Sequence, residues 1–101
     1  MKTLVTHNYY LYILTNKTKT VLYIGITNNL KERLYRHRNS EAEIKSFTAK
    51  YKCFYLVYWE HYQEVNTAIN REKELKGWRR EKKNDIINKE NPQWIFLNDE
   101  F

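Results

Sequence analysis

The sequence contains few of the residues that break or cross-link a chain: one proline, two glycines and one cysteine among 101 residues. So few breakers exclude a linker or a disordered chain, and the lone Cys53 cannot form an internal disulfide. No apolar run approaches the roughly 20 residues that a membrane helix needs. Residues 1–10 lack the apolar stretch of a signal peptide. We therefore expect one cytoplasmic domain over residues 1–101, with its core at about 8–97.

Aromatic and basic residues are abundant instead. Aromatic residues make up 16% of the chain and hydrophobic residues 42%, which suffices for one compact core filled with large rings. The net charge of +6 and the isoelectric point of about 9.4 suit an anionic partner, of which nucleic acid is the commonest. A charge of this size also fits a surface that only keeps the protein soluble. The distribution of the charge must therefore distinguish the two interpretations.

Three runs of aromatic and branched residues predict strands. The runs at 9–14 and 21–26 are separated by a short polar link, as in a β-hairpin, and both are apolar enough to be covered on both faces. The third run, at 53–59, is apolar enough to predict the central strand.

Helices are expected between and after these strands. Asn29 followed by Glu32 resembles a capping box and predicts a helix over about 30–38, whereas 39–50 are expected to form a loop with one irregular turn.

The second half of the chain changes to a helical period. An apolar stripe from Glu64 predicts a helix that Gly77 ends as its C′ residue. A shorter helix over about 80–89 precedes Asn91-Pro92, and the apolar tail 94–97 is expected to pack back on the core. The fold class is therefore α+β: a three-stranded antiparallel sheet flanked by helices, in the order β-β-α-β-α-α.

One carboxylate interrupts the apolar stripe of the 64–77 helix. Glu72 lies between the apolar positions of this helix, where a charge is costly unless it is paired or binds a metal. The alternative is a partly exposed Glu72 paired with Lys73 or Lys76. Periodicity alone favours neither interpretation.

The first helix is strongly basic, with five cationic or titratable residues within eight positions: Lys31, Arg33, Arg36, His37 and Arg38. A solvated face explains Lys31 and Arg36. Arg33 and His37 are four residues apart on the apolar side, where a guanidinium is well placed to contact a phosphate. We expect Lys31, Arg33, Arg36 and Arg38 to bind nucleic acid.

Two tyrosines, Tyr12 and Tyr23, occupy similar places in the two hairpin strands, so their hydroxyls converge if the strands pair. Core packing is the commoner reason for tyrosines in strands.

Four segments in this order resemble the GIY-YIG nuclease superfamily. They are Tyr10-Leu11-Tyr12, Tyr23-Ile24-Gly25, Leu30-x-x-Arg33-x-x-x-His37, and the segment 68–78 that contains Glu72. Tyr10 stands where the first signature element has a glycine. Over about 85 residues the chain is similar to small stand-alone bacterial members and to the N-terminal nuclease domain of the bacterial excision-repair nuclease.

The resemblance implies a metal-dependent endonuclease that hydrolyses phosphodiester bonds in nucleic acid, with DNA favoured over RNA. Glu72, rather than Glu74, would bind one Mg²⁺ or Mn²⁺ ion. The remaining members of the implied catalytic set are Tyr12, Tyr23, Arg33 and His37.

The same resemblance assigns roles to these four. Arg33 would neutralise charge on the phosphoryl oxygens. Tyr12 is the first choice for the base that takes a proton from the attacking water, and Tyr23 is the alternative. His37 is either a helper near the phosphate or a packing residue. We expect the helices that carry Arg33 and Glu72 to flank one face of the sheet.

Two other functions remain open: a nucleic-acid-binding module that cleaves poorly, and an interaction domain with exposed tyrosines. The joint presence of both tyrosines, the arginine and the glutamate favours the nuclease. Specificity would come from the domain itself, a protein partner or self-association, and a monomer or weak dimer is expected. Segment 71–83 is expected to extend the basic surface around the site.

Overall fold

The computed structural model describes residues 7–39 and 50–101, except the side chains of residues 37–39. Most of the loop expected at 39–50 lies outside these residues. The described elements follow the expected order and are β1 (Tyr9–Thr15), β2 (Leu22–Thr27), α1 (Leu30–Asn39), β3 (Tyr55–Tyr62), α3 (Val65–Lys76), α4 (Arg80–Glu90) and the short 3-10 helix η2 (Asn98–Glu100). Within the described ranges, no helix has the length and apolar character to cross a membrane.

The three strands form one antiparallel sheet in the order β2-β1-β3. The central strand is therefore β1, and the prediction that the third strand is central is wrong. Residues 11–15 of β1 are all buried, whereas Trp59 and His61 of β3 are exposed. The third strand also runs from Tyr55 to Tyr62 rather than from 53 to 59, because its last residues still pair with the start of β1.

The C-terminal segment covers the outer edge of β3, which explains why an edge strand is so apolar. The Leu56 N–H donates to Asn98 Oδ1 (2.8 Å), and the Leu56 carbonyl accepts from the Leu97 N–H (2.7 Å). Asn91 Nδ2 donates to the Val57 carbonyl (3.0 Å). These bonds satisfy backbone groups that a fourth strand would otherwise pair. As expected, the apolar tail packs back on the core.

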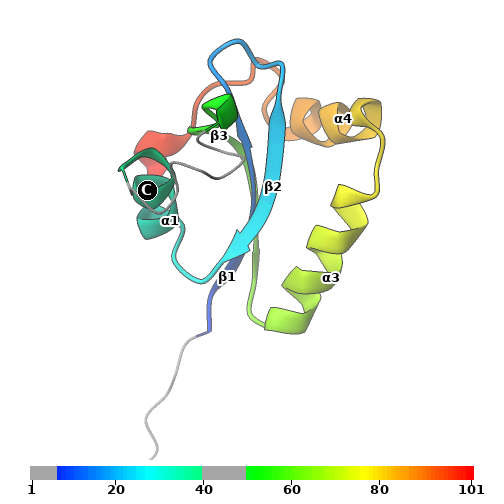
Figure 1. Ribbon diagram of the computed structural model, residues 1–101. Coiled ribbons are helices and arrows are strands. Elements are labelled where there is room, and N and C mark those ends of the chain that lie inside the picture. Colours follow the sequence, from blue (N-terminus) through cyan, green and yellow to red (C-terminus); the bar gives the residue numbers. More distant parts are fainter. Residues whose placement is uncertain (1–6, 40–49) are drawn as a thin grey trace, which may run out of the picture.

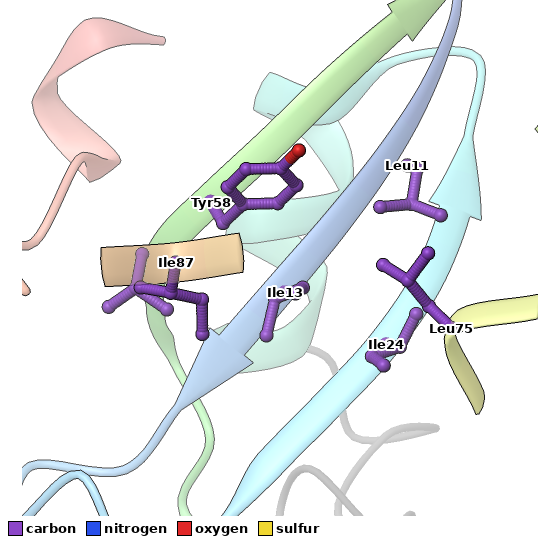
Figure 2. Packing of buried hydrophobic residues seen from close by; sticks show 7 residues of the cluster. Leu11, Ile13, Ile24, Tyr58, Leu75 and Ile87 are labelled. Carbon is purple, nitrogen blue, oxygen red and sulfur yellow. The ribbon is translucent and has the colours of Figure 1, made fainter. Parts of the chain in front are cut away.

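The two faces of the sheet carry separate clusters, because successive side chains of a strand point to opposite faces. The face under α1 contains Tyr12, Leu14, Leu30, Leu34, Cys53 and Leu56. The opposite face, under α3 and α4, contains Leu11, Ile13, Ile24, Val57, Tyr58, Leu75 and Ile87 (Figure 2). In Figure 1, α1 and α3 accordingly lie on the two sides of β2. Cys53 is a core residue as expected, and burial raises the pKa of its thiol to about 11.

The predicted helix ends at Asn29, Gly77 and Asn91 are confirmed, but Gly77 differs from the prediction in its conformation. Asn29 Oδ1 accepts from the Glu32 N–H (3.1 Å), which caps the start of α1. Gly77 follows the last residue of α3, and its N–H donates to the Lys73 and Glu74 carbonyls (both 3.2 Å). Its φ of −80° is right-handed, so the left-handed C′ conformation expected of this glycine is not adopted.

Candidate active site

Tyr12 and Tyr23 lie beside each other on the face that α1 covers. Their ring centroids are 6.2 Å apart and the ring planes are tilted by 40°. The antiparallel register of β1 and β2 places Tyr12 opposite Gly25 and Tyr23 opposite Leu14, which puts both rings on the same side. Tyr12 is only 1% exposed, whereas Tyr23 is partly exposed. The pairing that the sequence suggested therefore exists, but only Tyr23 retains access to solvent.

Gly25 gives the Tyr12 ring its place. A Cβ added at Gly25 would lie 2.6 Å from the Tyr12 hydroxyl oxygen and 2.7 Å from the ring carbon that bears it. Both distances are far inside van der Waals contact, so the tyrosine occupies the space that any other side chain would need. The glycine that ends the second signature segment is thus required by close approach.

Gly25→Ala is expected to destabilise the protein by about 1–3 kcal/mol, because the buried Tyr12 ring must shift to admit the methyl group. A thermal melt measures the loss. Gly77→Ala is the matched control, since its Cβ would meet nothing closer than the Glu74 carbonyl at 3.5 Å. Equal melting temperatures for the two variants would contradict the close-approach explanation.

Arg33 lies half-buried on α1, beside the turn that follows β2. A polar hollow of about 110 Å³ is found there, lined by Thr27, Asn28, Asn29, Glu32, Arg33 and Arg36. Thr27 Oγ1 accepts from the Asn29 N–H (3.1 Å) and so fixes the approach to the helix. The Arg36–Glu32 pair (3.4 Å) is more than half exposed and holds Arg36 only weakly. Two guanidinium groups at a polar hollow suit a phosphate.

The other basic residues of α1 are only partly described. Lys31 is exposed at the start of the helix. The side chains of His37 and Arg38 lie outside the described residues, so their predicted roles stay predictions.

Glu72 lies on α3 and its side chain is 20% exposed. Lys76 Nζ is 3.7 Å from Glu72 Oε1, which is the paired arrangement that the sequence left as an alternative. Such a helical pair, with Lys76 half exposed, contributes only about 0.3–0.5 kcal/mol. The contact therefore presents little obstacle to a cation that competes for the carboxylate.

Arg33 and Glu72 do not flank one face of the sheet, so that prediction is wrong. Their helices pack on opposite faces, because the apolar side of α1 contacts the Tyr12 cluster and that of α3 contacts the Leu11 cluster. In the described part of the chain, β2 pairs only with β1. The outer edge of β2 lies between α1 and α3 (Figure 1), and a ligand that crosses this edge can reach both helices.

The α3 side of this edge is also hollowed and basic. A space of about 290 Å³ is lined by residues 22–24 of β2 together with Lys76 and Lys83. Cations thus lie on both sides of the β2 edge, as a bound phosphate chain would need. The described residues contain no cluster of three or more His, Cys, Asp or Glu side chains that could bind a metal without help from a ligand.

A second, more completely bonded carboxylate, Glu60, was not predicted from the sequence. Glu60 on β3 accepts hydrogen bonds from the hydroxyls of Tyr58 and Tyr62, the latter at 2.6 Å. It also accepts from Arg71 Nε and Nη2 at 3.0 and 3.1 Å, and Arg71 Nη1 donates to Glu74 (2.8 Å). The Glu60 side chain is 14% exposed, less than that of Glu72. We refer to Tyr58, Glu60, Tyr62 and Arg71 as the Glu60 network.

The network shifts the pKa of its members. Burial alone would raise the pKa of Glu60, but hydrogen bonds from Arg71 and the two tyrosines outweigh it and hold the pKa below its ordinary value. Burial, followed by the hydrogen bond to Glu60, raises the pKa of Tyr62 to about 12. Glu60 is therefore ionised and both tyrosines are neutral near neutral pH.

The Glu60 network predicts a stability that falls in acid. Since the folded pKa of Glu60 lies below its unfolded value, near 4.5, its contribution is complete above that pH and is lost as the pH falls through the folded pKa. Denaturant unfolding of wild type and Glu60→Gln across pH 2–7 measures this contribution as a difference, which isolates Glu60 from the other acids. A difference that stays constant with pH would contradict the assignment.

The basic segment 71–83 is less available for nucleic acid than expected. Arg71 is held by the Glu60 network, and its guanidinium lies 5.2 Å from the Trp78 ring centroid. Arg80 donates to the carbonyls of Thr20 and Lys19 at 2.7 and 3.1 Å and so anchors the β1–β2 turn. The cations of this segment that line the β2 edge are Lys76 and Lys83.

Comparison with known proteins identifies the family. The model of the GIY-YIG catalytic domain matches residues 8–85. A UPF0213 protein of Bacillus pumilus is 32% identical over 81 residues, which cover 80% of each chain. A UPF0213 protein of Staphylococcus saprophyticus is 30% identical over 79 residues, or 78% of this chain and 93% of the relative. The solution NMR structure of a UPF0213 protein of Bacillus halodurans superimposes with a TM-score of 0.56 at 25% identity, covering 86% of this chain and 89% of that one. The chain belongs to the GIY-YIG catalytic domain family.

Proposed function

We propose that the protein is a metal-dependent endonuclease that hydrolyses phosphodiester bonds in nucleic acid, with DNA favoured over RNA. Membership of the nuclease family over residues 8–85 is the observation that carries the proposal. The contact between Tyr12 and Tyr23 beside a basic edge of the sheet supports it, because hydrolysis of a polyanion needs cations and a proton acceptor together.

Glu72 is the residue that would hold the metal. A single hard carboxylate suits Mg²⁺ or Mn²⁺, which are commonly bound by one or two carboxylates, with water and phosphate oxygens as the other ligands. When bound, the ion would supply positive charge to the scissile phosphate and to the leaving oxygen. The weak contact with Lys76 leaves the carboxylate available to it.

The remaining roles follow from position and exposure. Arg33 would bind the phosphoryl oxygens from the α1 side of the β2 edge and stabilise the charge that develops there. A general base must come within hydrogen-bond reach of the water it deprotonates. Tyr23 is partly exposed and Tyr12 is buried, so we now favour Tyr23 as the base and Tyr12 as the residue that positions it.

Metal removal tests the proposal. Purified protein is incubated with duplex, single-stranded, nicked and branched DNA and with RNA, in Mg²⁺, in Mn²⁺ and in excess chelator. We expect cleavage of at least one substrate with metal and none after chelation. Protein that is inert on every substrate with both metals would overturn the proposal and favour a binding module, the alternative supported by the burial of Tyr12.

Affinity is expected to reside in the domain itself or in a protein partner. The cations around the β2 edge can contact phosphates, and such contacts position a nucleic acid without reading its sequence. Sequence or structure preference therefore needs a further element.

A further inference from the structure

A second group of aromatic side chains continues the row of Tyr12 along the same face of the sheet. Tyr10 lies at its centre, with ring centroids 5.2 Å from His61, 6.0 Å from Trp59 and 6.1 Å from Phe101. The Trp59 and Phe101 rings meet edge to face at 5.3 Å. The register of β1 and β3 pairs Tyr10 with His61 and Tyr12 with Trp59, so the group directly adjoins Tyr12. We call Tyr10, Trp59, His61 and Phe101 the aromatic platform.

The aromatic platform is open to solvent. Trp59 is 37% exposed and His61 is exposed, so both rings present surface to solvent. Exposed indole and imidazole rings in a cluster offer faces on which a planar group can stack.

A hollow of about 240 Å³ adjoins the platform. Tyr10 and Phe101 line it together with the amide side chains of Asn8 and Asn28 and the exposed Lys31. Pockets that take drug-sized ligands have volumes of about 300–1,000 Å³. This hollow is slightly smaller, so it suits a single planar ring. Amides can hydrogen-bond the edge of a base, and a lysine can contact the phosphate next to it.

The position of the hollow links it to the candidate active site. Asn28 and Asn29 line both this hollow and the one that contains Arg33, so the two share a wall. A strand with one phosphate at Arg33 would place a neighbouring nucleotide at the aromatic platform. A larger hollow of about 610 Å³, which Trp59 lines at the outer edge of β3, contains Glu90 and Glu100 and so disfavours a polyanion. The side of the platform that suits a nucleotide is therefore the one formed by Tyr10 and Phe101.

We propose that the hollow beside the aromatic platform binds one unpaired base of a nucleic acid, stacked on Tyr10 and Phe101, with Lys31 on its phosphate. The substrate class is then a nucleic acid with an unpaired nucleotide beside the cleaved bond, such as an overhang or a flap. The inference rests on the proposed function only in taking the ligand to be a nucleic acid.

The test separates base stacking from phosphate contacts. A labelled DNA hairpin carries either a short thymidine overhang or an overhang of abasic residues with the same phosphates, and anisotropy measures binding in excess chelator, where nothing is cleaved. Wild type is expected to bind the thymidine overhang at least about five-fold more tightly, the lower end of what one stacked base contributes. Phe101→Ala is expected to lose this preference and to bind the abasic overhang as wild type does, because Phe101 lines the hollow.

Trp78→Ala is the control, because Trp78 lies on the α3 side and its ring is already covered by the Lys82 ammonium, 4.4 Å from the centroid. It is expected to keep the preference. If Phe101→Ala fails to fold, Phe101→Leu replaces it, since leucine keeps an apolar side chain and removes the ring. Equal wild-type affinity for the two overhangs, or a loss in Phe101→Ala that is the same for both, overturns the inference. Cleavage without a base preference would overturn this inference and leave the proposed nuclease function intact. A base preference without cleavage would support this inference and contradict the proposed nuclease function.

Discussion

Replacement of Glu72 by glutamine is expected to lower the cleavage rate by about 100-fold or more, because charge stabilisation at the phosphate of this order depends on the metal that Glu72 would hold. The substitution keeps the size of the side chain and removes one negative charge. Nucleic-acid binding should therefore persist or strengthen. The free energy of unfolding should change by no more than about 0.5 kcal/mol, since only the weak contact with Lys76 is lost.

Glu74→Gln is the matched control for this experiment. It removes the same charge from the same helix, two residues away, and its side chain is 53% exposed. Cleavage, binding and melting temperature are measured on each preparation, and Glu74→Gln should cleave as wild type does. A Glu72→Gln variant that is less stable but equally active per folded molecule would assign Glu72 a structural role only.

Substitution of Arg71 by methionine is expected to destabilise the protein by about 3 kcal/mol, since it leaves the Glu60 carboxylate largely buried without its cation. For a domain of this size, each kcal/mol lowers the melting temperature by about 4–8 °C. Such domains have a free energy of unfolding of about 5–15 kcal/mol, so this loss is a large share of the total.

A double variant tests the cause of this loss. Glu60→Gln combined with Arg71→Met should cost much less than the sum of the two single changes, because no uncompensated charge remains buried. Arg36→Met is the control, since Arg36 and Glu32 form a pair whose side chains are 57% and 56% exposed, and it should cost at most about 0.5 kcal/mol. Additive effects of the two single substitutions would show that the network contributes no coupling.

The proximity of Tyr12 and Tyr23 could be predicted because it depends on local features. A short polar link favours pairing of the two runs, and the register that pairs Tyr12 with Gly25 and Leu14 with Tyr23 places both tyrosines on one face. The cap at Asn29 was predictable for the same reason, since the donor lies three residues from the acceptor.

The relation of Arg33 to Glu72 could not be predicted, because periodicity shows which side of a helix is apolar but not which face of the sheet it covers. Every residue from 11 to 14 in β1 is apolar and buried, so the alternation that would distinguish the two faces is hidden. The burial of Glu60 was not predicted, because tyrosine and glutamate at every second position also fit a strand face that is exposed to solvent. Only the later Arg71, brought over the strand by α3, supplies the charge that makes burial tolerable.

The bonds from the C-terminal segment to β3 have a consequence for biosynthesis. Leu56 and Val57 obtain their outer backbone partners from Asn91, Leu97 and Asn98, which the ribosome adds about 35–40 residues later, or some seconds at 5–20 residues per second. A sheet of β1, β2 and β3 that forms before this segment docks has the outer edge of β3 uncovered and apolar. A nascent chain in this state offers an open strand to other chains. Premature termination before residue 91 would make that exposure permanent, so truncated products are expected to aggregate rather than to persist as soluble, partly active domains.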